Sequence, residues 1–129
     1  MGDKTKEQLL EELIIDFFPY PIAIFTPEYT LTLVNKAFEA ETKTWFRNPE
    51  KGVVRILPYK INNTQLAAAI SRVFTGDTFF LEDLKNPFSM FSGITGQSAI
   101  QSDRFPKAVI FPVPADNARI THGVIVFMS

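Results

Sequence analysis

Two segments near the C-terminus constrain the fold more than any other part of the chain. Residues 107–113 and 120–128 are rich in β-branched and aromatic residues and are apolar at consecutive positions, as in Val124-Ile125-Val126-Phe127. Because neighbouring side chains of a strand point to opposite faces, such runs predict a sheet that is covered on both faces. The short turn-forming segment 114–118 lies between them and predicts that the two strands pair as an antiparallel hairpin.

Three further strands are predicted, which makes a five-stranded antiparallel sheet. Residues 22–25 and 30–34 are predicted to form a hairpin whose turn has Pro27 at its second position. Residues 79–81 are predicted to form the third of these strands. Asn35 follows the second strand directly. Its side-chain oxygen can accept a hydrogen bond from a free amide group of a following helix. We therefore interpret Asn35 as a structural cap at which the strand ends and a helix begins.

The helices are predicted from apolar residues at helical spacing. The clearest internal helix opens at residues 62–64 and ends before Gly76, which stands where a left-handed residue commonly ends a helix. Residues 1–19 form an amphipathic N-terminal helix that ends at the prolines. We expect the internal helices to cover one face of the sheet and the N-terminal helix to cover the other. Residues 86–106 have no sustained period and predict a long loop.

Composition excludes several classes of protein. The chain has 129 residues, which fits one domain, and 46% of them are hydrophobic, which fits a compact core. The net charge of −1 is spread along the chain without a basic stripe, so we expect no nucleic-acid partner. There is no cysteine, no apolar run long enough to span a bilayer and no signal peptide. We therefore expect a cytoplasmic protein segment without membrane contact.

The order of elements over residues 20–129 resembles a PAS domain, the sensory module of histidine kinases and related regulators. The resemblance rests on Asn35, Ala37 and Phe38 after the first hairpin, on Gly76-Asp77 after the long helix, and on the last strand. It implies an α+β fold with short helices on one face of a five-stranded antiparallel sheet and an N-terminal flanking helix. It also implies a non-catalytic sensor for signal transduction, such as that of a two-component system, with an output domain in the same longer chain.

The same resemblance allows the cofactors of PAS domains to be considered one by one. Light sensors of the flavin and coumarate types bond their chromophores to a cysteine, which is absent here. Haem-binding relatives use a histidine on the long helix, whereas the single histidine, His122, begins the last strand. One imidazole without a carboxylate cluster is no metal site, and no serine or carboxylate partner stands at a catalytic spacing from it. We expect no cofactor and no metal, and an unidentified small ligand stays open.

Two groups of residues are candidates for function. The ligand-pocket candidates are apolar positions expected on the inner faces: Leu33, Phe38, Ile56, Ile70, Phe74, Val109, Phe111, Val124 and Val126. The candidates for a homodimer interface are Leu10, Ile14 and Phe17 on the N-terminal helix. The alternatives are that the pocket residues are only core and the domain is a ligand-free protein–protein interaction module. A small enzyme with a cone-shaped, isomerase-like fold is a further alternative.

Overall fold

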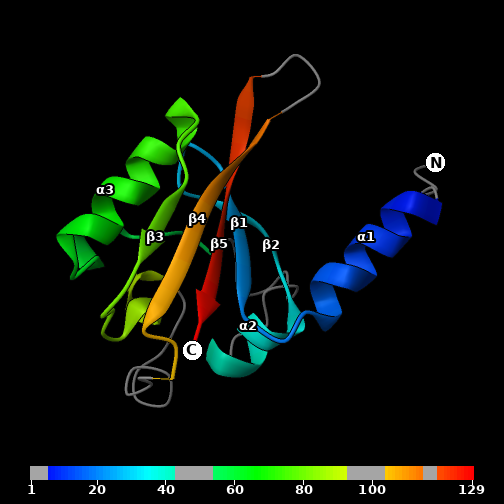
Figure 1. The fold of residues 1–129 in the computed structure, drawn as a ribbon, viewed down its shortest axis with the longest axis horizontal. Coiled ribbons are helices and arrows are strands. Elements are labelled where there is room, and N and C mark those ends of the chain that lie inside the picture. Colours follow the sequence, from blue (N-terminus) through cyan, green and yellow to red (C-terminus); the bar gives the residue numbers. More distant parts are fainter. Residues whose placement is uncertain (1–5, 43–53, 93–103, 115–118) are drawn as a thin grey trace.

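The computed structural model describes residues 6–42, 54–92, 104–114 and 119–129 of the chain (Figure 1). The helices are α1 (Lys6–Phe17), α2 (Lys36–Thr42) and α3 (Thr64–Arg72), with the 3-10 helices η2 (Pro58–Lys60), η3 (Val73–Thr75) and η4 (Pro87–Met90). The strands are β1 (Ile22–Phe25), β2 (Leu31–Val34), β3 (Phe79–Leu81), β4 (Lys107–Pro114) and β5 (Ile120–Met128). All five strands lie within one residue of their predicted bounds.

The strands form one antiparallel sheet in the order β2-β1-β5-β4-β3. β5 lies at its centre, where Val126 is opposite Ile22 of β1 on one side and Val109 of β4 on the other. The prediction that the two C-terminal segments are neighbouring antiparallel strands is therefore confirmed. β1 and β2 come before the internal helices in the chain, and β5 comes after them. The pairing of β1 with β5 therefore joins two segments that are far apart in the sequence.

The β1–β2 hairpin has the predicted tight turn. The Tyr29 amide donates to the Thr26 carbonyl at 2.8 Å, and the Thr26 amide donates to the Thr30 carbonyl at 2.9 Å. Tyr29 takes a left-handed conformation with φ 65°, which a non-glycine residue adopts at some steric cost. The free edge of β2 is met by residues 54–56, because the Leu31 amide donates to the Val54 carbonyl at 3.0 Å.

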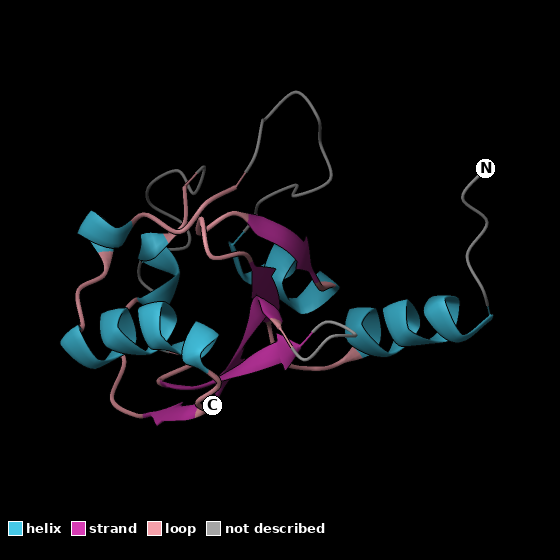
Figure 2. Cartoon of the chain, turned by 90° about the horizontal axis from the view of Figure 1, so that it is seen from above, coloured by secondary structure: helices cyan, strands magenta, loops and turns pink. Residues whose placement is uncertain are grey.

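The internal helices lie together on one side of the sheet, as predicted (Figure 2). Asn63 caps the start of α3, because its side-chain oxygen accepts a hydrogen bond from the Leu66 amide at 2.9 Å. η3 continues α3 and ends at Gly76, which has φ 105°. The predicted left-handed helix end at this glycine is confirmed, and the turn brings the chain directly into β3.

The prediction of a loop over residues 86–106 is wrong at its first part. Residues Pro87–Met90 form η4, because Pro87 suits the first position of a helical turn and Ser89 bonds back to the residue before it, Asn86. The Ser89 hydroxyl and amide both donate to the Asn86 carbonyl, at 2.8 and 3.0 Å. This short helix matters for the core, because it places Phe88 against the sheet. Residues 93–103 lie outside the described part of the chain.

Gly123 permits a close approach between η3 and the sheet. A Cβ atom at this position would lie 2.7 Å from the Phe25 ring carbon Cζ and 2.9 Å from the Val73 carbon Cγ1. Those distances are shorter than carbon atoms tolerate, and both neighbours are fully buried, so they have little room to move. The glycine is therefore needed for η3 to pack on the centre of the sheet.

We expect Gly123→Ala to lower the free energy of unfolding by about 1–3 kcal/mol, the usual cost of overpacking a core. Chemical denaturation of the purified variant measures it. Shortening the opposing ring with Phe25→Leu should reduce the cost of the alanine in a double-mutant cycle. Strictly additive effects of the two substitutions would contradict the proposed clash.

Candidate functional site

Phenylalanine rings occupy the space between the sheet and the helices. Phe88 of η4 lies at the centre of this aromatic cluster, with its ring centre 4.5 Å from that of Phe127 and 5.9 Å from that of Phe38. Phe105 and Phe91 lie 6.0 and 6.4 Å from it, and all five rings are buried. Several pairs meet edge to face, an arrangement that adds attraction beyond the burial of their area. The cluster fills this part of the interior with side chains.

The predicted pocket residues do not lie together. Phe38, Ile56, Ile70 and Phe74 belong to the inner core or pack against it. Val109, Phe111, Val124 and Val126 belong to a separate apolar cluster on the opposite side of the sheet. Leu33 is paired with Ile24, which lies in that second cluster, so its side chain is on that side too.

On β4 and β5, the side chains that face the internal helices belong to the residues that alternate with the predicted ones. Ala108 and Ile110 of β4, with Ile125 and Phe127 of β5, are packed in the inner core. The prediction of Val109, Phe111, Val124 and Val126 as inner residues is therefore wrong by one position. A shift of one residue moves a side chain to the other face of a strand, and these strands are apolar on both faces. The prediction of Leu33 as an inner residue is wrong as well, because its partner Ile24 lies in the outer cluster.

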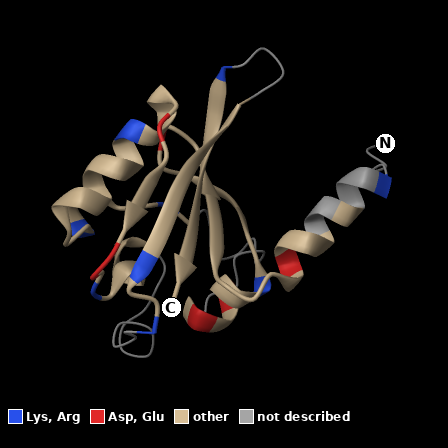
Figure 3. Cartoon of the chain, viewed as in Figure 1, with Lys and Arg blue, Asp and Glu red and all other residues tan. Residues whose placement is uncertain are grey.

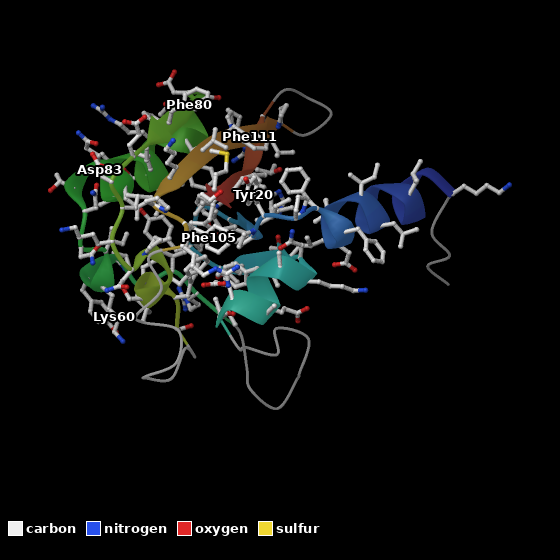
Figure 4. The ribbon with its side chains drawn as sticks, turned by 60° about the horizontal axis from the view of Figure 1, so that its bottom comes forward. Tyr20, Lys60, Phe80, Asp83, Phe105 and Phe111 are labelled. Atoms are coloured by element: carbon white, nitrogen blue, oxygen red, sulfur yellow. The ribbon has the colours of Figure 1, made fainter. Side chains whose placement is uncertain are left out.

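We call the apolar cluster on the side away from the internal helices the outer face. Its residues are Ile22, Ile24, Val109, Phe111, Val124, Val126 and Met128. Phe80 extends it, because Phe80 is opposite Val109 in the sheet and its side chain is 79% exposed. Figure 4 shows Phe80 and Phe111 on the same side of the ribbon. Lys107 is the only charged residue in the five strands, so the sheet itself presents almost no charge (Figure 3).

α1 does not cover the outer face, contrary to prediction. It extends away from the domain (Figures 1 and 2), and of its described side chains Ile15 packs against the outer-face cluster. The predicted interface residues Leu10, Ile14 and Phe17 are 58%, 59% and 69% exposed, and Leu13 between them is exposed as well. These residues recur at the spacing of one helix face, so α1 carries an apolar stripe that the described part of the chain leaves in solvent.

Asn35 determines how the chain leaves α1 and enters the sheet. Its Oδ1 atom accepts hydrogen bonds from the amide groups of Phe38, at 3.0 Å, and of Ile22, at 2.9 Å. Its Nδ2 atom donates to the carbonyl groups of Tyr20, at 2.9 Å, and of Phe18, at 3.4 Å. The residue is fully buried. The predicted cap is confirmed. The same side chain also binds the linker that follows α1, which a capping pattern does not predict.

Tyr20 lies at the edge where the inner core and the outer face meet. It packs against both clusters, and its ring meets the Phe105 ring edge to face at 6.3 Å (Figure 4). Its hydroxyl group lies 3.1 Å from the hydroxyl group of Ser129, just beyond β5. The Pro21 carbonyl accepts a hydrogen bond from the Phe127 amide at 2.9 Å. The linker 18–21 is therefore fixed to the sheet at several points.

The described part of the chain holds the single histidine and a surface depression. The Nδ1 atom of His122 lies 2.9 Å from the Thr121 hydroxyl oxygen, and no cluster of metal-ligating side chains occurs in the described ranges. Asp83, Leu84, Lys85 and Pro106 line a shallow surface depression beside β3. None of the helices that the structure describes is both long and apolar enough to cross a membrane.

Solved structures resemble this chain over nearly its whole length. The PAS domain of BvgS from Bordetella pertussis matches with a TM-score of 0.60 at 15% identity, covering 97% of this chain and 87% of that one. A sensory box sensor histidine kinase from Vibrio cholerae matches with a TM-score of 0.52 at 15% identity, covering 94% and 86%. The PAS domain of the nitrogen regulation protein NR(II) from Vibrio parahaemolyticus matches with 0.52 at 11%, covering 93% and 97%.

These likenesses, with the strand order and the helices on one face, show that the chain has the PAS fold. The resemblance inferred from Asn35, Gly76 and the last strand is confirmed at the level of the fold. No family model and no curated protein sequence matches the chain, and the identities to the solved structures are low. The fold is that of the sensory modules found in histidine kinases and regulators.

Proposed function

We propose that the chain is a PAS sensory and dimerisation module of a larger signalling protein, a histidine kinase or a related regulator. The observation that carries the proposal is the apolar stripe of α1, whose residues are exposed, together with the apolar outer face of the sheet, where Ile22, Val124 and Val126 are buried within the chain but Phe80 is 79% exposed. Similar folds that belong to a sensor histidine kinase and to BvgS support the setting in a signalling protein.

A second copy of the chain is the partner that we propose for both surfaces. α1 has 12 residues and is therefore about 18 Å long, enough to lie across several strands of a sheet. Within one chain, α1 points away from the outer face, so the two surfaces cannot cover each other there (Figure 2). In a two-fold dimer, each could be buried against the other copy, and both copies would gain the same contact.

The interior formed by the described residues is packed with side chains, which favours a module that works without a ligand. The inner members of the predicted pocket are packed in the core, and the aromatic cluster takes up the space beside Phe38. A signal would then act by favouring one packing of the domain over another, which α1 passes on. Native mass spectrometry of the purified chain measures bound mass and stoichiometry together. We expect a dimer without additional mass, and a dimer that retains a small molecule would instead support ligand sensing.

Replacing Leu10 and Ile14 with glutamate should convert the dimer to a monomer. The substitutions place charges on the apolar stripe of α1, and burying unpaired charge in an interface is strongly unfavourable. We expect the dissociation constant to rise at least about 100-fold, which corresponds to about 2.7 kcal/mol. Light scattering over a range of protein concentrations measures the change.

The matched control adds the same charges to another helix. Ala68 and Ser71 of α3 are exposed, and Ala68→Glu with Ser71→Glu should leave the dimer unchanged. A parent protein that is monomeric throughout, or a Leu10→Glu, Ile14→Glu variant that dimerises like the parent, contradicts the proposed interface.

A further inference from the structure

The base of α1 contacts the start of α2, in addition to the packing of Ile15 against the outer face. The ammonium group of Lys36, the first residue of α2, lies 4.5 Å from the ring centre of Phe17, the last residue of α1. One residue earlier, the Asn35 side chain donates to the carbonyl groups of Phe18 and Tyr20. Both contacts join the base of α1 to the same short stretch of chain. The base of α1 is therefore expected to follow the beginning of α2.

The linker between α1 and β1 is too stiff to absorb such a movement. Pro19 and Pro21 restrict their own φ angles and also the backbone of the residues before them. The residues before the prolines, Phe18 and Tyr20, are those whose carbonyl groups Asn35 holds. A displacement at Asn35 must therefore either turn α1 or break these hydrogen bonds.

Phe38 connects the same side chain to the interior. Its amide group donates to the Asn35 Oδ1 atom, and its ring lies in the aromatic cluster, 5.0 Å from the Phe91 ring and 5.9 Å from the Phe88 ring. Backbone and ring belong to one residue in the first turn of α2. A change in how the Phe38 ring packs shifts that turn, and the shift reaches Asn35 directly.

We propose that Asn35 couples the packing of Phe38 in the core to the direction of α1. Through the hydrogen bonds of this one side chain, repacking of the aromatic cluster turns α1 and its apolar stripe relative to the sheet. The inference rests on the proposed function, because α1 is taken to carry the interface that such a movement would alter. A tilt of about 20° at the base moves the far end of a helix about 18 Å long by about 6 Å.

The test follows the direction of α1 by a distance measurement between spin labels. The chain has no cysteine, so Lys6→Cys at the far end of α1 and Ala68→Cys on α3 give unique attachment sites, both exposed. The labelled chain is diluted into an excess of unlabelled chain, so that only distances within one molecule are recorded. We expect one narrow distance distribution in the parent protein.

Asn35→Asp distinguishes the role of Asn35 as a helix cap from its role in holding the linker. The aspartate keeps the oxygen that accepts from the Phe38 and Ile22 amides, and aspartate is a good helix cap. The asparagine amide has two hydrogens for the Phe18 and Tyr20 carbonyl groups, whereas the aspartate has none when ionised and one when protonated, so at least one of these hydrogen bonds is lost. Phe38→Leu tests the same coupling without touching Asn35. Phe25→Leu is the matched control, because Phe25 is equally buried but packs against Phe74 and beside Gly123.

We expect Asn35→Asp and Phe38→Leu to broaden the label distribution and to move its mean by roughly 5 Å, while Phe25→Leu leaves it as in the parent. An unchanged distribution in either of the first two variants, or an equal change in Phe25→Leu, overturns the coupling. Light scattering of the parent separates this result from the proposed function. If the parent is a monomer and α1 moves in both variants, the proposed dimer is wrong and the coupling holds. If the parent is a dimer and α1 does not move, the coupling is wrong and the dimer holds.

Discussion

A Phe88→Ala variant is expected to lose about 3–5 kcal/mol of unfolding free energy, the range for removing a large aromatic side chain from a core. The Phe88 ring meets the rings of Phe38, Phe91, Phe105 and Phe127, so its removal takes a neighbour from each of them. The phenylalanine rings around the gap are rigid and collapse into it poorly. Guanidinium denaturation followed by circular dichroism measures the loss.

Tyr59→Ala is the matched control for this prediction. It removes an aromatic ring from η2, where Tyr59 is 79% exposed and lies outside the proposed interface, so we expect a change within about 0.5 kcal/mol. Both variants should be measured at one protein concentration, since the stability of a dimer depends on it. Equal losses in the two variants would show that the aromatic cluster contributes nothing particular to the core.

The sequence predicts the elements of this fold well because each has a strong local cause. Pro27 fixes the first turn, Asn35 provides a cap at the point where a strand pattern ends, and Gly76 supplies a left-handed residue where α3 and η3 stop. These effects act over a few residues and do not depend on the rest of the chain. The local signals pair β1 with β2 and β4 with β5, and they do not place the first hairpin beside β5, which the structure shows.

The two faces of the sheet could not be told apart from hydrophobicity. β4 and β5 are apolar at successive positions, so either set of alternate residues could have been the inner one. Gly123 carried the missing signal. A glycine inside a strand commonly marks a place where another backbone or side chain comes close, and Gly123 meets Phe25 and Val73 of the core. Counting every second residue from it gives Ile125 and Phe127, which are the inner positions.

The position of α1 could not be predicted from its amphipathic pattern. An apolar stripe shows that a helix has a partner, and it does not say whether the partner is its own sheet or another chain. The direction of α1 depends instead on hydrogen bonds to the carbonyl groups of Phe18 and Tyr20, which any residue could offer. Only the donor, Asn35, is specific, and a capping interpretation uses its oxygen and leaves its amide nitrogen unexplained.

Replacing Asn35 with alanine is the sharpest test of that second role. The substitution leaves the Ile22 and Phe38 amides and the Tyr20 and Phe18 carbonyl groups without their partner. Each buried polar group left unpaired costs about 1–3 kcal/mol, so we expect a total loss of at least about 3 kcal/mol in unfolding free energy. Denaturant titration of the purified variant gives the value.

Asn63 provides the comparison that makes this loss interpretable. It caps α3 through one hydrogen bond from its side-chain oxygen to the Leu66 amide, at a partly exposed site. Asn63→Ala should therefore cost about 1 kcal/mol, the usual effect of losing a helix cap. If Asn35 only capped α2, the two alanine variants would lose similar amounts. The excess loss at Asn35 measures how strongly its side chain holds β1 and the base of α1. If there is no excess, the Asn35 side chain does not hold the base of α1, and a movement of α2 would not be passed on to α1.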